Sequence, residues 1–161
     1  MGNSDYRLGV GLMIVNHEGK IFVGKRSYLS QRPNLSSNKV WQMPQGGIKK
    51  GEKPEAAVFR EMQEEIGTNQ GDIIAASVHL LKYDFPKNIQ KHIFNGSYKG
   101  QAQRWFLIAF TGREEGIVLN QGSQEFIDWK WVTLDELFDL VVEFKRELYG
   151  HVIEAFSWYF H

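Results

Sequence analysis

The chain has 161 residues with 19 basic and 19 acidic side chains, so its formal net charge is zero. Because it contains no cysteine, disulfide frameworks, zinc–thiolate sites and thiol nucleophiles are excluded. A protein that coats long nucleic acid by neutralising phosphates usually carries a basic excess, which is missing here. Any RNA substrate would therefore be held by its terminus in a local pocket.

Length and composition predict one folded domain over residues 1–161, since 42% of the residues are apolar and 14% are aromatic. The N-terminal segment MGNSDYRLGVGLMIV has no basic stretch followed by a long apolar run. No stretch reaches the ~18 apolar residues that a membrane span needs. We expect a cytoplasmic enzyme, a monomer or weak homodimer, with neither a membrane nor DNA as a partner.

The N-terminal third predicts strands that lead to a glycine-rich loop. Apolar, β-branched runs at residues 8–15 and 20–26 flank a short turn-forming segment, which favours a hairpin. Residues 27–39 are rich in Ser and Asn without periodicity and predict a surface loop. Residues 40–44 predict a short strand before the glycines, and a helix is expected over residues 54–66.

The middle of the chain predicts more strands. Residues 73–85 favour one or two strands, and residues 101–110 favour a strand whose apolar centre is covered on both faces. The basic, irregular segment 86–100 is either a solvated loop or a flap that faces the substrate. We expect residues 116–120 to pair beside the long strand, and residues 128–132 to form the last strand.

The C-terminal part predicts a helix. Thr133 and Glu136 have the spacing of a capping box. Helical periodicity then continues to about Phe160, with Gly150 as a possible interruption. The aromatic residues at the end of the chain, including Phe156, are expected to dock on the core.

The predicted helix over residues 54–66 carries an unusual concentration of charge. At about 100° per residue, Glu61, Glu64 and Glu65 fall in one arc, beside an arc of apolar side chains. Acids three and four residues apart repel by roughly 0.2–0.5 kcal/mol per pair. The helix dipole also disfavours negatively charged side chains in the last turn of the helix. A divalent cation is the simplest compensating charge, so the pattern predicts a metal site.

A glycine-rich loop precedes this helix. We expect Gly46, Gly47 and Gly51 to permit positive φ angles and a close approach of the backbone to a ligand. Gly67 is placed to end the helix. Lys53 has no side-chain acceptor and is a poor N-cap.

These residues carry a family resemblance. The stretch resembles the Nudix box, G-x5-E-x7-R-E-U-x-E-E-x-G-U, in which U is a bulky apolar residue. The matching residues are Gly46, Glu52, Arg60, Glu61, Met62, Glu64, Glu65 and Gly67. Thr68 stands at the last, apolar position, which packs and does no chemistry. The resemblance implies an α/β (α+β) fold, an α/β/α sandwich around a mixed β-sheet. The alternative is a solvated acidic helix face in which Arg60 pairs with Glu64.

The resemblance also implies the chemistry. Mg²⁺ binds carboxylate and phosphate oxygens while it keeps several waters, and Mn²⁺ or another divalent cation can substitute. By resemblance the metal ligands are Glu61, Glu64 and Glu65, to which we add Gly46. We place Arg60 with these glutamates in the catalytic group, where it holds a glutamate or the loop. The general base is one of these glutamates or a glutamate on a distant loop.

A narrower resemblance covers almost the whole chain. The segment WQMPQGG from Trp41, the run QAQRWFLIAF from Gln101 and the tripeptide Phe144-Lys145-Arg146 are similar to bacterial RNA 5′-pyrophosphohydrolases and related dinucleoside polyphosphate hydrolases. The relatives have QKQ where this chain has Gln-Ala-Gln, so any role of that lysine is missing at Ala102.

This second resemblance implies further site residues. In that group the arginine matching Arg7 and a basic residue near Arg26 contact phosphates. The match of Glu125 joins the metal cluster, and the match of Phe144 stacks on a base. Without the resemblance, Phe144 would more often be a core residue, the two arginines surface charges and Glu125 a loop acid. Further substrate-binding candidates are Gln45 and Lys145.

We therefore expect a metal-dependent Nudix hydrolase that removes pyrophosphate from 5′-triphosphorylated RNA. The 5′-monophosphate product would promote mRNA decay. The alternative substrate is a dinucleoside polyphosphate, which requires the same bond chemistry. An alternative from another class is a module that binds nucleotides without cleaving them. Such a module would be expected to lose ligands of the box, and here all are present.

Overall fold

The computed structural model describes residues 5–26, 40–119 and 126–160. The predicted surface loop 27–39 and Glu125 lie outside these residues. The strands are β1 (Tyr6–Val15), β2 (Ile21–Arg26), β3 (Trp41–Gln42), β4 (Gln45–Gly47), β5 (Gly71–Ala76), β6 (Leu81–Asp84), β7 (Gly100–Phe110) and β8 (Phe126–Val132). The helices are α2 (Pro54–Ile66), α3 (Lys87–Gln90), α4 (Leu134–Leu140) and α5 (Arg146–Phe156), with 3₁₀ turns η3 (Phe94–Gly96), η4 (Glu114–Gly116), η5 (Glu143–Lys145) and η6 (Ser157–Phe160).

The sheet is built around two long parallel strands. β1 and β7 pair from Tyr6 opposite Gly100 to Val15 opposite Ala109. The strand order is β3-β2-β1-β7-β5, with β4 paired to β1, β6 to β7 and β8 to β2. These other pairings are antiparallel, so the predicted mixed sheet and N-terminal hairpin are confirmed. The central side chains of β7 are buried, as expected for a strand covered on both faces.

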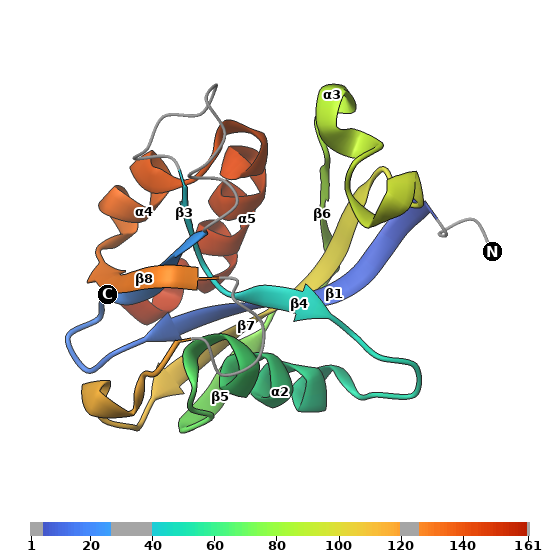
Figure 1. The fold of residues 1–161 in the computed structure, drawn as a ribbon. Helices are drawn as coiled ribbons and strands as arrows, with labels where there is room; N and C mark the ends of the chain where they lie inside the picture. Colours follow the sequence, from blue (N-terminus) through green and yellow to red (C-terminus); the bar gives the residue numbers. More distant parts are fainter. Residues whose placement is uncertain (1–4, 27–39, 120–125, 161) are drawn as a thin grey trace.

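Helices cover both faces of the sheet (Figure 1). On one face, Val58 and Met62 of α2 pack with apolar side chains of β1 and β7. On the other face, Leu137 of α4 and Leu148 of α5 join a second core cluster. The result is the α/β/α sandwich that the resemblance implied.

The helix α2 has the predicted bounds. Gly67 ends it in the left-handed conformation with φ of 81°, and Lys53 makes no side-chain cap hydrogen bond. Thr68 is buried where the box usually has an apolar residue. The backbone N–H of Val118 donates to the Ile66 carbonyl and satisfies one of the last helical acceptors. The segment before Asn120 therefore covers the end of α2, and the strand predicted at residues 116–120 is wrong for its described part, 116–119.

The C-terminal region differs from the single helix that periodicity predicted. The capping box of Thr133 and Glu136 is present and opens α4. The chain then becomes extended at Val141 and Val142, which are both buried. Burial of this β-branched pair breaks the helix, whereas Gly150 lies inside α5. Phe156 is buried but Trp158 is 56% exposed, so only part of the aromatic end docks.

The helix α5 is also hydrogen-bonded to the segment between β3 and β4. The fully buried Tyr149 hydroxyl accepts a hydrogen bond from the backbone N–H of Met43 at 2.7 Å. Met43 lies between β3 and β4, three positions before Gly46. None of the helices in the described segments has the length and apolar character of a membrane span.

Candidate active site

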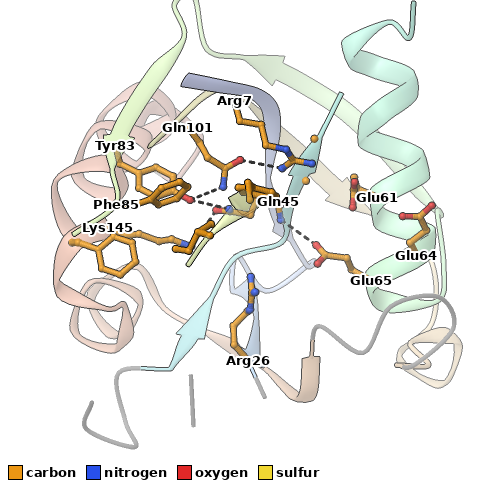
Figure 2. A pocket seen from close by; sticks show the side chains of 15 residues that line it. Arg7, Arg26, Gln45, Glu61, Glu64, Glu65, Tyr83, Phe85, Gln101 and Lys145 are labelled. Carbon is orange, nitrogen blue, oxygen red and sulfur yellow. Dashed lines mark hydrogen bonds between the residues drawn. The ribbon is translucent and has the colours of Figure 1, made fainter. Parts of the chain in front are cut away.

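A cavity of about 270 Å³ lies between α2, β4 and the elements that follow β6 (Figure 2). Its lining comes from positions far apart in the sequence. The lining residues are Arg7, Arg26, Gln45, Gly46, Gly47, Glu61, Glu64, Glu65, Tyr83, Phe85, Ile93, Phe94, Gln101, Phe144 and Lys145.

One wall is acidic and belongs to α2. Glu65 is buried, and its Oε1 accepts a hydrogen bond from the backbone N–H of Gln45 at 3.1 Å. The Glu61 side chain is 13% exposed and the Glu64 side chain 44% exposed. The three carboxylates thus share one wall but differ strongly in their access to water.

Arg60 lies behind this wall. Its guanidinium donates two hydrogen bonds of 2.8 Å to the carboxylate of Glu52, in the bidentate geometry that arginine favours. It also donates to Glu61 at 2.9 Å, to the Gly47 carbonyl at 2.8 Å and to Glu64 at 3.4 Å. One cation therefore fixes the loop, the strand β4 and the acidic wall relative to one another.

These contacts shift the pKa values of the carboxyl groups. The hydrogen bonds from Arg60, with one from the backbone of Lys49, lower the pKa of Glu52 to about 2. Burial raises the pKa of Glu61, although the hydrogen bond from Arg60 opposes this effect. The pKa of Arg60 is raised in turn, chiefly by Glu52, so this residue stays charged.

The glycines of β4 act through the space they leave. Neither Gly46 nor Gly47 has a positive φ, which corrects our expectation, while Gly51 does with φ of 78°. A Cβ at Gly46 would overlap the carboxylate of Glu61, and a Cβ at Gly47 would overlap the guanidinium of Arg7. Side chains from the two walls therefore approach the β4 backbone at the positions where it has no side chain.

The opposite side of the cavity is cationic. Arg7 comes from β1, Arg26 from the end of β2 and Lys145 from η5. Lys145 is buried, and its Nζ donates to Oε1 of Gln42 at 2.9 Å and to Oε1 of Gln45 at 3.3 Å. Positive groups thus line the same cavity as the acidic wall.

A chain of polar side chains joins two of these cations, Arg7 and Lys145 (Figure 2). The Arg7 guanidinium donates to Gln101 at 3.4 Å, and the Gln101 amide donates to the Tyr83 hydroxyl at 2.7 Å. The Gln45 amide also donates to the Tyr83 hydroxyl, at 3.1 Å. Because Gln45 accepts from Lys145, the network runs from Arg7 to Lys145.

Carboxylate oxygens are the ligands that a hard dication prefers, but the three carboxylates do not point toward one common position in this arrangement. Within residues 5–26, 40–119 and 126–160, no three acidic or histidine side chains are grouped to hold a metal ion. Arg60 draws Glu61 toward itself, and Gln45 holds Glu65. The arginine thus supplies part of the compensating charge that we had assigned to a metal alone. The carboxylate oxygens that line one wall still fit a hard dication. Glu61 lies against Gly46, where no side chain separates its carboxylate from the backbone.

Most predicted site residues are brought together. Of the described candidates, all line the cavity except Arg60, which contacts the acidic wall from behind. Sequence reasoning missed the lining residues Tyr83, Phe85, Ile93, Phe94 and Gln101. The signals in the sequence that point to Gln101 and Phe94 are the Gln-Ala-Gln segment and the irregular basic segment 86–100, respectively. Phe144 is half-buried, between its two alternatives: it packs on the core and also lines the cavity.

Comparison with known proteins identifies the family. The sequence profile of the NUDIX domain matches residues 5–152. The chain belongs to the Nudix family.

The Nudix protein is also similar to curated proteins along most of its length. Proteins named RNA pyrophosphohydrolase from Rickettsia africae and Rickettsia prowazekii are each 48% identical over 152 residues. The match covers 94% of this chain and 90% of each relative. Nudix enzymes generally use divalent metal cations.

Solved structures of low identity share the fold. The MutT protein of Methanosarcina mazei Go1 is similar with a TM-score of 0.66 and 19% identity, over 96% of this chain and 97% of that one. The E. coli dihydroneopterin triphosphate pyrophosphohydrolase has a TM-score of 0.69 and 16% identity, over 92% and 97%. At these identities the likeness shows the Nudix fold alone.

Proposed function

We propose that this Nudix protein is a divalent-metal-dependent RNA pyrophosphohydrolase. It would convert a 5′-triphosphate end of RNA to a 5′-monophosphate with release of pyrophosphate, and so promote mRNA decay. The observation that carries the proposal is that three carboxylates of α2 line one cavity together with Arg7, Arg26 and Lys145. The name of the Rickettsia relatives supports RNA as the substrate.

The cationic side would hold the polyphosphate. Arginine presents a fork of donors that matches phosphate oxygens, and Lys145 adds a point charge from η5. The hydrogen bonds of Gln45, Tyr83 and Gln101 link Lys145 to Arg7. Phe144 would stack on a base beside the phosphates, a contact that tolerates different bases and suits many transcripts.

The acidic wall would hold Mg²⁺ or Mn²⁺ through Glu61, Glu64 and Glu65, with Gly46 beside them. When bound, the dication supplies charge neutralisation of the phosphates and lowers the pKa of an attacking water. Arg60 keeps Glu61 against the open position at Gly46, so we assign it a positioning role. Glu125 remains a proposed ligand that lies outside the described residues.

The substrate is tested by comparing two polyphosphates. A 5′-triphosphorylated oligonucleotide is expected to be turned over more efficiently than diadenosine tetraphosphate, measured as kcat/KM with Mg²⁺. Release of pyrophosphate, or of two phosphates in steps, identifies the bond that is cleaved. If the dinucleotide is cut and the oligonucleotide is untouched, the assignment to RNA is wrong and the dinucleoside polyphosphate alternative replaces it.

The metal assignment is tested with Glu64→Gln. This variant keeps the shape of the half-exposed side chain but removes its charge, so metal-dependent turnover is expected to be lost while the thermal unfolding midpoint is preserved. Glu55→Gln, an exposed position in the first turn of α2, is the matched control. Unchanged turnover in Glu64→Gln would contradict the assignment. A cytoplasmic location, a monomer or weak homodimer, and the lack of a DNA partner stay predictions.

A further inference from the structure

We propose that Phe94 is a positioning residue that holds the Arg7 guanidinium at the phosphate side of the cavity. The inference rests on the proposed function, because it takes Arg7 to be a phosphate contact. Phe94 belongs to the irregular segment between β6 and β7, for which sequence left a solvated loop and a substrate-facing flap as alternatives. Since Ile93 and Phe94 both line the cavity, this segment faces the site.

The ring of Phe94 supports the Arg7 guanidinium. The guanidinium carbon of Arg7 lies 4.3 Å from the centroid of the ring, within the range of a cation–π interaction. The hydrogen bond from Arg7 to Gln101 is long, at 3.4 Å. In the part of the chain that the structure describes, no carboxylate lies within ion-pair distance of Arg7, although its charge is close enough to Glu61 to lower the pKa of that carboxyl group. The aromatic ring therefore does what an acidic partner does for Arg60.

The choice of a ring has a chemical consequence. A carboxylate beside Arg7 would neutralise its charge and compete with a phosphate for the same N–H donors. A neutral ring attracts the cation while leaving its charge and its outward donors available. An arginine held in this way is oriented before the polyphosphate arrives, so less conformational freedom is lost on binding.

The backbone at Phe94 is held in an unfavourable conformation. Phe94 has φ of 51° and Asn95 has φ of 58°, followed by Gly96 at 74°. A bulky residue with positive φ is uncommon and strained, and such strain gathers at functional sites. Burial does not account for it, because the side chain is 41% exposed.

Neighbouring groups keep the ring in place despite this strain. Phe94 packs against Phe85 and Tyr98 at centroid distances of 6.3 and 6.1 Å. The segment is closed by hydrogen bonds from Phe85 N–H to the Lys99 carbonyl and from Lys99 N–H to the Asp5 carbonyl, both 2.8 Å. The second bond ties it to the chain two residues before Arg7.

The test compares Phe94→Leu, which keeps an apolar side chain without a π face, with Phe94→Tyr, which keeps the ring. Phe94→Leu is expected to raise KM for a triphosphorylated oligonucleotide roughly three- to fivefold with kcat nearly unchanged. Phe94→Tyr is expected to restore the wild-type KM. Phe138→Leu is the matched control, because Arg146 lies over the Phe138 ring at the same 4.3 Å outside the lining of this cavity.

Two outcomes would overturn the inference. One is a Phe94→Leu variant whose KM equals that of wild type, including the case in which its unfolding midpoint falls as much as that of Phe138→Leu. The other is an equal effect of Phe94→Leu in an Arg7→Ala background, where a positioning role predicts that the effect disappears. If wild type fails on RNA but cleaves diadenosine tetraphosphate, the proposed substrate is wrong, and the same variants measured with that dinucleotide still decide the role of Phe94.

Discussion

At the scale of single residues, Arg60 does the most to shape the site. Its planar group contacts Glu52 twice, Glu61 once and the Gly47 carbonyl once. Lysine carries the same charge, but its ammonium cannot reproduce a fork that points in three directions. The pKa of Glu52 is lowered chiefly because this guanidinium is close. Both residues hold the glycine-rich segment through hydrogen bonds, from Arg60 to the Gly47 carbonyl and from the Lys49 N–H to Glu52.

The pair of Glu52 and Arg60 predicts a pH dependence of stability. The pKa of Glu52 is about 2 in the folded protein, against an ordinary value of 4.5. The ionised group therefore favours folding above about pH 4.5, and this contribution disappears as the pH falls through about 2. Urea unfolding between about pH 6 and pH 2 should show a smaller loss of stability in Glu52→Gln than in wild type.

The exposed Glu55, in the first turn of the same helix, provides the control. Glu55→Gln should follow the wild-type pH dependence, because Arg60 contacts Glu52 and not this side chain. Parallel curves for Glu52→Gln and wild type would contradict the prediction.

Gly46→Ala is predicted to damage the site without unfolding the chain. The added methyl group overlaps the carboxylate of Glu61, which must shift from its position. A displacement of about 1 Å in a reacting group can cost on the order of 100-fold in rate, and we expect a loss of that size in kcat/KM. Gly116→Ala adds the same methyl group where no atom lies within 4 Å, and it should leave turnover unchanged.

At the scale of elements, local signals were sufficient where both ends of a helix are marked. Proline at the start and Gly67 at the end placed α2 correctly, because neither signal depends on distant residues. The break at Val141 and Val142 was not predictable, since apolar residues at helical spacing favour a continuous helix. Tertiary burial of these two side chains prevails over the local pattern.

The capping box of α4 gives a prediction at this scale. The Thr133 side chain accepts from the Glu136 N–H, and the Glu136 carboxylate accepts from the Thr133 N–H. Thr133→Ala should therefore lower the free energy of unfolding by about 1 kcal/mol, measured by urea denaturation. Thr133→Ser keeps the acceptor and should recover most of this loss. Neither variant should change turnover, because α4 contributes no residue to the cavity. A reduced kcat in both variants would contradict the expectation that α4 has no part in turnover.

At the scale of the whole molecule, the two sides of the cavity differ in how far sequence could predict them. The acidic side comes from one helix, so its spacing could be read directly. The other side joins residues separated by long stretches of chain: Lys145 meets Gln42 across 103 positions, and Gln101 meets Arg7 across 94. Such pairings are set by strand order and register, so Tyr83 and Phe94 became visible only in the folded structure.

The bond between Tyr149 and Met43 supplies a prediction at this largest scale. Tyr149→Phe keeps the packed ring but leaves the buried N–H of Met43 without this acceptor. We expect a loss of about 1–3 kcal/mol in the free energy of unfolding. Tyr159→Phe, which removes a hydroxyl from the partly exposed end of the chain, is the control and should cost less. Equal midpoints for the two variants would show that the bond contributes little.

This same link bears on the order in which the protein matures during translation. The strands and the acidic helix leave the ribosome before Lys145 and Tyr149, which follow them in the sequence. A nascent chain that ends before them has the carboxylates but lacks Lys145, the proposed phosphate contact. It also lacks the Tyr149 hydroxyl that accepts a hydrogen bond from the Met43 N–H. The cavity therefore gains its full lining only after Lys145 has been added, later than every strand of the sheet.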